Sequence, residues 1–85
     1  MQSHPQRVSG IEIREVDDGF MIHQPERDRV HYLNHTATLV LELCNGERSL
    51  VQIAELVAAA YGLTAPPEKE VAEVLEKLRD EALLQ

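Results

Sequence analysis

The hydrophobic pattern of this chain changes its period once, at Leu33 and Asn34, and this change limits what the chain can fold into. Before Asn34, apolar and polar residues alternate, which is typical of strands with one buried face. After Asn34, apolar residues recur every three or four positions, which is typical of amphipathic helices. The Asn34 side chain can also accept a hydrogen bond from a backbone amide and so cap a helix. The sequence therefore predicts strands first and helices afterwards.

Three strands are expected before this change. They cover residues 11–16, 20–23 and 29–33. Asp17-Asp18-Gly19 separates the first two and favours a tight hairpin turn, because glycine adopts positive φ at little cost. The connection to the third strand is longer and begins near Pro25, which lacks an amide donor. Short connections between neighbouring strands predict an antiparallel three-stranded meander.

Three helices are expected after the strands. The first begins after Asn34 and ends at Asn45-Gly46, which favours a C-terminal turn. The second begins at Ser49, because Gln52 follows three residues later and completes the spacing of a capping box. Gly62 is a typical stop for this helix, and the pair Pro66-Pro67 suits the start of the third. The stripes expected to be buried comprise Ala37, Val40, Leu41 and Cys44, then Leu50, Ile53, Ala54, Val57 and Tyr61, and finally Val71, Val74, Leu75, Leu78 and Ala82.

This order of elements predicts the fold class. Strands followed by helices are typical of an α+β domain with its helices on one face of a small sheet. With 85 residues, the chain is expected to form one domain over residues 11–85. Residues 1–10 contain Pro5, Ser9 and Gly10 and are expected to form a flexible arm. The apolar pair Leu83-Leu84 is expected to fold back onto the core.

Composition argues against several classes of function. The net charge is −7, which disfavours nucleic-acid binding because phosphates are neutralised by Lys and Arg. The sequence has no apolar run of about eighteen residues and no signal-peptide pattern, so no membrane association is expected. The single cysteine, Cys44, cannot form an internal disulfide, and a reducing cytoplasm is the expected compartment.

Residues with reactive side chains form no catalytic motif. His31 and His35 are four residues apart, but the change from strand to helix lies between them, so they share no helix face. Cys44 lies on a predicted apolar stripe and is expected to be an inert buried thiol. The paired carboxylates Asp17-Asp18 are explained by the predicted hairpin turn rather than by a general acid and base. We therefore expect no catalytic residue, no metal site and no cofactor. Surface or capping roles are expected for His4, His23, His31 and His35.

The third strand is the best candidate for a binding surface. An outer strand of a meander carries unpaired backbone amides and carbonyls, which proteins normally protect or use. Arg29–Leu33 contains no proline and leads directly into the helices. An extended peptide could pair with it by β-augmentation, with backbone bonds giving affinity and side-chain pockets giving specificity. Alternatively, the N-terminal arm or a second copy of the chain covers this edge.

Several segments of the chain resemble a known family. Leu33-Asn34-His35-Thr36-Ala37 resembles an LN-x-TA segment, and residues 43–49 resemble an L-C-D/N-G-x-R-S/T turn. Ile53-Ala54 fits an E-I-A position, with Gln52 in place of the acid. The ending Val74-Leu75…Leu78…Leu83-Leu84 resembles V-x-x-x-L-x-x-L-x-x-x-G-L-I, although Ala82 replaces the usual glycine. In this order the segments are similar to the PqqD family of RiPP recognition elements, and the similarity covers the chain from Ile11 onward.

This resemblance implies a winged helix-turn-helix-like fold that binds a peptide rather than DNA. In such domains the leader of a ribosomally made precursor peptide adds as an antiparallel strand beside the third strand and packs against the third helix. The domain then presents the precursor to a modifying enzyme, often a radical SAM enzyme. It is thus a non-catalytic peptide chaperone, and a monomer or weak dimer is expected. Carried onto this chain, the peptide-binding residues are Arg29, Val30, His31, Tyr32, Leu33, Val71, Val74, Leu75, Lys77 and Leu78, with Lys77 or Arg79 at the rim.

Three other functions stay open. Leader-binding proteins of lasso-peptide systems have a similar fold and deliver the leader to a protease instead of a radical SAM enzyme. A winged-helix DNA-binding module would need exposed basic or amide side chains on its recognition helix, whereas the second helix offers Gln52 and Glu55 but no Lys or Arg. A structural module could use the same edge strand for exchange between copies.

Overall fold

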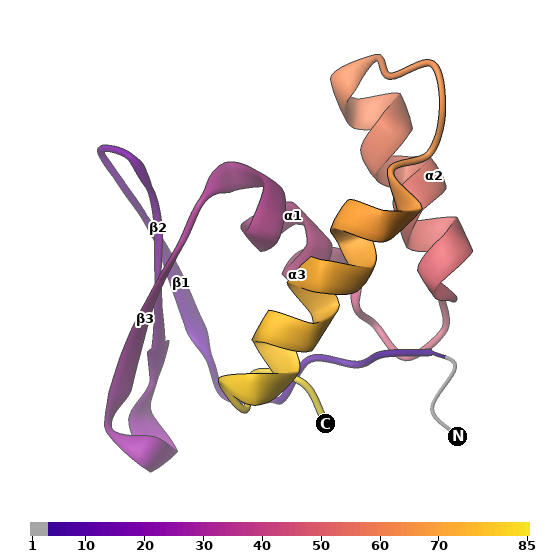
Figure 1. Cartoon of the computed structure of the whole chain (residues 1–85). Coiled ribbons are helices and arrows are strands. Elements are labelled where there is room, and N and C mark those ends of the chain that lie inside the picture. The colour runs from indigo at the N-terminus through magenta and orange to yellow at the C-terminus, as the bar shows by residue number, and fades with distance from the viewer. Residues whose placement is uncertain (1–3) are drawn as a thin grey trace.

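The structure is a computed structural model and describes residues 4–85 (Figure 1). A three-stranded antiparallel sheet is followed by three helices, which confirms the predicted α+β fold. A single 3-10 turn, η1 (Pro25–Arg27), connects the second and third strands. The elements are β1 (Glu12–Val16), β2 (Gly19–Gln24), β3 (Arg29–Leu33), α1 (His35–Leu43), α2 (Leu50–Tyr61) and α3 (Glu68–Asp80).

The sheet has the order β1-β2-β3, so β3 lies at one edge. Val16 pairs with Gly19 across a two-residue turn, which confirms the hairpin predicted at Asp17-Asp18-Gly19. In β3, His31 and Leu33 are buried, whereas Val30 and Tyr32 are exposed on the opposite face of the sheet. The strand therefore has one face toward the helices and one face toward solvent.

The predicted helix starts are confirmed by their hydrogen bonds. Asn34 Oδ1 accepts from the Ala37 amide at 2.8 Å and caps α1. Ser49 and Gln52 form both hydrogen bonds of a capping box at the start of α2. These contacts satisfy amides that have no partner inside the helix, and they fix where each helix begins. Gly62 ends α2 in the left-handed conformation, with φ of 65°.

The end of α3 has an unusual residue in a familiar motif. The Leu83 amide donates to Leu78 O at 2.9 Å, and the Ala82 amide donates to Arg79 O at 3.0 Å. These two bonds define a Schellman motif, whose left-handed position is normally glycine. Here Ala82 occupies it with φ of 61°. Leu78 and Leu83 are both fully buried, so the turn folds the C-terminal residues back onto the core as predicted.

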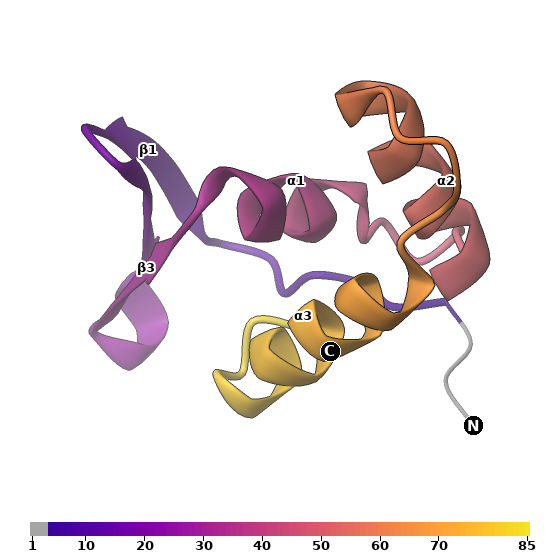
Figure 2. The same ribbon diagram turned by 45° about the horizontal axis from the view of Figure 1, so that its top comes forward.

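The helices are not all in contact with the sheet. Figures 1 and 2 show α1 between the sheet and α2, with α3 crossing beside α1 and its C-terminal end nearer to the sheet than its N-terminal end. One aliphatic core joins these layers, but Tyr61, which was predicted to be buried, is 46% exposed. The core comprises Ile22, Leu33, Ala37, Val40, Leu41, Cys44, Ile53, Ala54, Val57, Val71, Leu75, Leu78, Leu83 and Leu84.

Part of the expected N-terminal arm is instead paired with the rest of the chain. The Arg7 amide donates to Cys44 O at 2.9 Å, and the Val8 amide donates to Leu83 O at 2.9 Å. Gln6 also accepts from the Gln85 amide at 2.8 Å. Through these bonds the N-terminal segment links the loop after α1 to the C-terminal residues. The same expectation for residues 1–3 lies outside the described residues. Among residues 4–85, no helix combines the length and the apolar character needed to cross a membrane.

Candidate functional site

The register of the sheet determines which backbone groups of β3 are available. A two-residue turn is closed by a hydrogen-bonded pair, so Val16 and Gly19 bond to each other. Antiparallel residues alternate between the two sides of a strand, so Phe20, Ile22 and Gln24 direct their amides and carbonyls toward β3. Their partners are Leu33, His31 and Arg29. The amides and carbonyls of Val30 and Tyr32 therefore point to the open edge of the sheet.

The Gly19 backbone supports this register independently. A Cβ built on Gly19 would collide with the carbonyl oxygen of Leu33, so this oxygen points toward β2. The Val30 and Tyr32 side chains are 48% and 70% exposed, on the face away from the helices. In β3, His31 and Leu33 thus belong to the core, whereas Val30 and Tyr32 belong to the surface, and Arg29 at the start of the strand is also exposed.

One flank of α3 faces this strand. The Glu81 carboxylate, directly after α3, contacts the ring of His31 in β3 at 3.1 Å. Residues spaced by three or four lie on one side of a helix, so Glu70, Val74 and Lys77 share the flank of Glu81. Val74 is partly buried and Lys77 is exposed. This flank, which we call the β3-facing flank, is apolar in the middle and charged at both ends.

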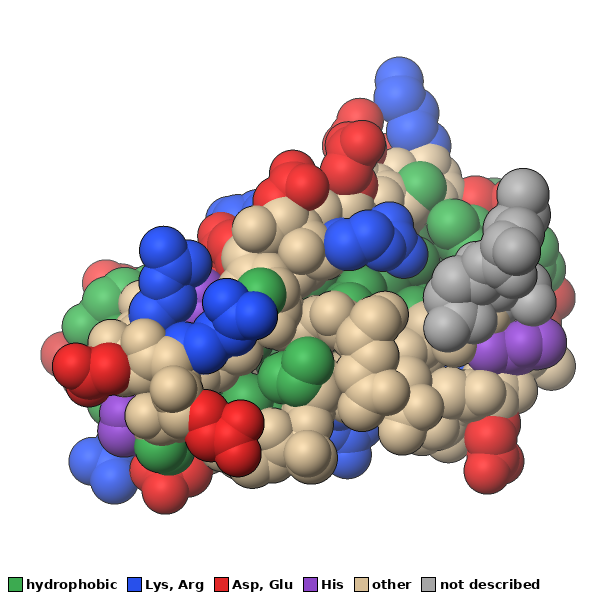
Figure 3. All heavy atoms as spheres, turned by 90° about the horizontal axis from the view of Figure 1, so that it is seen from below, with side chains coloured by type: hydrophobic (Ala, Val, Ile, Leu, Met, Phe, Trp, Pro, Cys, Tyr) green, Lys and Arg blue, Asp and Glu red, His purple; other side chains and the backbone are tan. Residues whose placement is uncertain are grey.

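The remaining predicted α3 residues lie elsewhere. Val71 and Leu78 are almost fully buried and pack in the core beneath the flank. Leu75 and Arg79 instead line a separate hollow of about 620 Å³, which α3 forms with the start of α2 and with Pro5. Figure 3 views the molecule from the side crossed by the N-terminal segment, where hydrophobic surface is recessed beside a basic side chain. The predicted stripe is thus divided between two surfaces, and Arg79 does not lie at the rim of the β3-facing flank.

An apolar pocket of about 430 Å³ adjoins the flank at its other end. It shares Glu70 and Val74 with the flank and lies between α1, α2 and α3. Tyr61 and Leu63 contribute exposed apolar surface to it, at 46% and 47% exposure. Sequence reasoning assigned Tyr61 to the core and overlooked Leu63, although an apolar residue directly after the glycine stop of a helix is a usable signal. The pocket is lined by Thr36, Val57, Tyr61, Leu63, Pro67, Glu70, Val71 and Val74.

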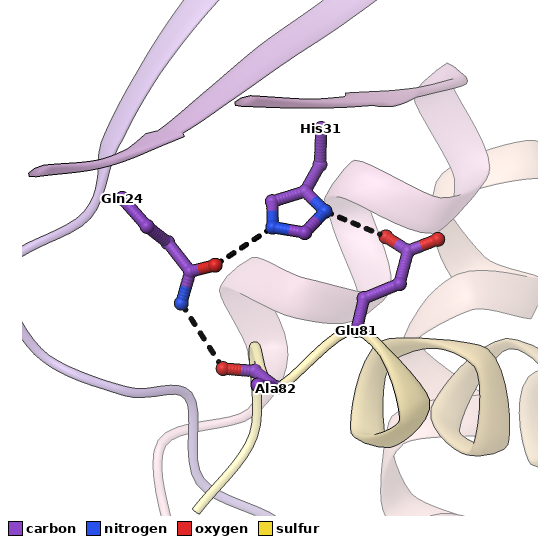
Figure 4. Close-up of polar contacts among 4 residues, drawn as sticks. All are labelled: Gln24, His31, Glu81 and Ala82. Atoms are coloured by element: carbon purple, nitrogen blue, oxygen red, sulfur yellow. Dashed lines mark hydrogen bonds and ion pairs between the residues drawn. The ribbon is translucent and has the colours of Figure 1, made fainter. Parts of the chain in front are cut away.

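A polar cluster joins β2, β3 and the end of α3 (Figure 4). His31 Nε2 lies 2.7 Å from Gln24 Oε1, and Gln24 Nε2 donates to the carbonyl of Ala82 at 3.1 Å. His31 Nδ1 lies 3.1 Å from Glu81 Oε1. His31 is therefore buried and bonded, and the surface role predicted for it is wrong. The contact holds the residue directly after α3 against the middle of β3.

The other reactive side chains stay apart from this site. Cys44 is buried and its thiol donates to Val40 O at 3.1 Å. Burial raises the pKa of the Cys44 thiol to about 11, although Arg7 and Arg79 act in the opposite direction. His23 contacts Glu12 at 3.5 Å on the outer face of the sheet. Within the described residues, no three His, Cys, Asp or Glu side chains are grouped so as to hold a metal ion.

Comparison with known proteins identifies the family. Residues 19–84 match the family model "Coenzyme PQQ synthesis protein D (PqqD)". The chain resembles, at 26% identity and a TM-score of 0.69, the PqqD truncation of Methylobacterium extorquens PqqCD, described as a functional and stand-alone RiPP recognition element; the match covers 95% of this chain and 87% of that one. It shares its fold with lasso peptide synthetase B1 complexed with the leader peptide, at 17% identity and a TM-score of 0.74, over 98% of this chain and 99% of that one. No curated protein sequence is significantly similar. The match to the family model spans most of the chain, which therefore belongs to the PqqD family.

Proposed function

We propose that this domain is a non-catalytic chaperone that captures the leader of a ribosomally synthesised precursor peptide at the edge of β3. The single observation that carries this proposal is the open edge itself: Val30 and Tyr32 direct backbone groups outward beside the β3-facing flank of α3. An added strand gains backbone hydrogen bonds from β3, and its inward side chains meet Val74 and the apolar pocket. Both solved neighbours are proteins of peptide modification, and one holds a leader peptide.

Within this proposal the residues have different tasks. Val30 and Tyr32 supply backbone donors and acceptors, and Val74 and Lys77 supply side-chain contacts. His31, Leu33, Val71 and Leu78 hold the strand and helix in place from the core. Arg29 lies at the end of β3 where an antiparallel ligand strand would leave the sheet. The precursor is made by ribosomes, so the cytoplasm is the compartment in which this capture takes place.

The edge assignment has a direct test in amide hydrogen exchange. A leader strand added to β3 protects the amides of Val30 and Tyr32, because these two point outward. The amides of His31 and Leu33 are already bonded to β2 and serve as internal controls. The probe is a synthetic peptide covering the leader of the precursor encoded beside this gene. Binding that leaves the Val30 and Tyr32 amides unprotected would falsify strand addition at this edge.

The enzyme that receives the precursor is proposed to be a radical SAM enzyme, as the PqqD family suggests. Alternatively, this domain is the leader-binding partner of a lasso-peptide protease, and the fold similarity to lasso peptide synthetase B1 favours this second reading. Co-purification of the domain with each candidate enzyme, with and without leader peptide, distinguishes them. A complex with a protease and none with a radical SAM enzyme decides for the alternative.

A DNA-binding winged helix is the third candidate, and electrostatics argues against it. The chain carries 15 Asp and Glu residues against 8 Lys and Arg. Most DNA-binding free energy comes from neutralising phosphates, so a surface with this balance repels the duplex. A gel-shift assay at low salt checks this, and strong binding that weakens as salt is added would overturn the peptide-binding proposal.

A further inference from the structure

The sheet has a second open edge, formed by β1 on the side away from β3 (Figure 2). Val16 and Gly19 form a hydrogen-bonded pair across the hairpin turn, and bonded residues alternate along a strand. The amides and carbonyls of Ile13 and Glu15 therefore point out of the sheet. Among residues 4–85, β2 is the only segment that hydrogen-bonds to the backbone of β1. These outward groups are thus free to bond to another strand.

Charged side chains line this edge. Glu12, Arg14 and Glu15 are all exposed, and charges on an outer strand usually keep other strands away. This protection depends on like charges meeting across the new strand pair, because opposite charges stabilise it. Glu12 and Arg14 have opposite signs and lie one residue to either side of Ile13. The charge pattern of β1 is therefore complementary to itself when the strand is reversed about Ile13.

This pattern selects one register for two antiparallel copies of β1. Residues that face each other across an antiparallel pair have the same bonding direction, so a two-fold axis must pass through a residue. An axis at Glu12, Arg14 or Glu15 would set that charged residue against its own copy, which is destabilising. An axis at Val16 would fall at the turn and pair only the end of the strand. An axis at Ile13 places Glu12 of each copy opposite Arg14 of the other.

The two faces of the sheet also suit this register. Glu12 contacts His23 on the outer face at 3.5 Å, and Arg14 shares this face because side chains alternate along a strand. The charged pairs would therefore form in solvent, where neither partner has to be buried. Ile13 lies on the opposite face, partly buried and packed against the core. Pairing at Ile13 brings two of these apolar side chains together and extends the apolar face of the sheet.

We propose that β1 is a self-association surface, to which β1 of a second copy of this chain adds antiparallel with the two-fold axis at Ile13. The two sheets then form one continuous sheet with a β3 strand at each outer end. Both β3 edges stay open, so association at β1 and peptide capture at β3 do not compete. The contact is a single strand pair with exposed charges, which makes the dimer weak. This inference does not depend on the leader-binding proposal.

Self-association is tested by analytical ultracentrifugation of the full chain from about 10 μM to about 1 mM, the range of weak complexes. The native chain is expected to change from monomer to dimer over this range. Arg14→Glu makes both cross-strand pairs Glu–Glu, and Glu12→Arg makes both Arg–Arg. Each variant should raise the dissociation constant of the dimer by at least about tenfold, because two attractive pairs become repulsive. A native chain that stays monomeric up to about 1 mM overturns the proposal.

A mixture of the two variants provides the matched control. In a mixed pair the two arginines of Glu12→Arg face the two glutamates of Arg14→Glu, so both opposite-charge pairs return with their roles exchanged. The mixed pair carries the same total charge as two native chains, so only the placement of the charges differs. The mixture should therefore associate about as tightly as the native chain. A mixture that associates no more tightly than either variant alone overturns the proposed register, provided that circular dichroism shows both variants folded.

Amide hydrogen exchange of the native chain, without peptide, locates the contact. Raising the protein concentration should protect the amides of Ile13 and Glu15, whereas the amide of Arg14 is already bonded to β2 and should not change. Protection of the Val30 and Tyr32 amides instead places the second copy on β3 and overturns the assignment to β1. Because this experiment contains no peptide, its outcome is separate from the test of leader capture.

Discussion

The carbonyl oxygen of Leu33 occupies the space where a side chain on Gly19 would begin. The two residues are 14 positions apart in sequence, and their contact brings the start of β2 against the end of β3. Gly19→Ala should therefore displace the strand that ends at the cap of α1. We expect a loss of about 1–3 kcal/mol in the free energy of unfolding, as for other overpacked sites. Urea denaturation followed by circular dichroism measures it.

The matched comparison for this change is Gly62→Ala. Gly62 has φ of 65° and no atom within 4 Å of an added Cβ. Its substitution costs only left-handed strain, about 1 kcal/mol. A loss at Gly19 no greater than the loss at Gly62 contradicts the steric argument and the register derived from it.

Ala82 offers the opposite experiment, a gain in stability. Its φ of 61° is a conformation in which a Cβ is strained, and the Schellman motif at the end of α3 normally has glycine there. Ala82→Gly should raise the free energy of unfolding by about 1 kcal/mol, after the higher chain entropy of glycine is subtracted from the relieved strain. Thermal unfolding monitored by circular dichroism is sufficient.

Asp28 provides the control for Ala82. It is the other non-glycine residue with positive φ in the described part of the chain, at 51°. Asp tolerates this conformation better than Ala, because its side chain can hydrogen-bond locally. Asp28→Gly should therefore stabilise less than Ala82→Gly. Equal gains at both positions argue that chain flexibility, rather than Cβ strain, governs the effect.

The two flanks of α3 can be separated by substitution. Val74→Asp places a charge in the middle of the β3-facing flank and should weaken leader binding by at least about tenfold, because the charge loses water when the peptide packs on it. Calorimetry with the synthetic leader gives the affinity, and circular dichroism verifies that the variant is folded. The control is Val51→Asp, since Val51 is 45% exposed and lines the hollow on the other side of α3.

If both variants weaken leader binding equally, the peptide is not bound specifically on either side of α3, and the assignment to the β3-facing flank is contradicted. If only Val51→Asp weakens binding, the peptide lies in the hollow beside α2 and Pro5, and the assignment to β3 is incorrect.

The separation of interacting residues along the sequence determines how much of this structure the sequence predicts. Asn34 caps an amide three residues away, and Ser49 and Gln52 satisfy each other within one turn, so both helix starts follow from local chemistry. The pairing of the N-terminal segment was not predictable, because Arg7 bonds to Cys44 and neither residue type favours the other.

The candidate site shows the same limit. A helical period reveals that Val74 and Leu75 are apolar and adjacent on α3, but only the packing of α1 and α2 shows that they belong to different surfaces. His31 looked like a surface histidine because its partner Glu81 is 50 residues away. The alternation in β3 was correctly predicted, whereas the direction of its backbone groups required the register of both hairpins.

Cys44 yields a prediction about reactivity and pH. Burial raises the pKa of its thiol from 9.0 to about 11, so at pH 8 the thiolate fraction is about a hundredfold lower than in the unfolded chain. Thiolate is the reactive form, and labelling of the native protein by a disulfide reagent should therefore be at least about a hundredfold slower than labelling in urea. Absorbance of the released thiol follows the rate.

The same shift predicts how stability depends on pH. The unfolded chain loses the thiol proton near pH 9, while the folded chain retains it until about pH 11. The contribution of this group to stability is therefore complete below pH 9 and declines as the pH rises toward 11. Cys44→Ala removes the titrating group, so its free energy of unfolding should decline less steeply between pH 9 and 11 than that of the native chain. An equal decline in both proteins assigns the loss to other groups that titrate in this range, such as tyrosine and lysine, and contradicts a role for the buried thiol.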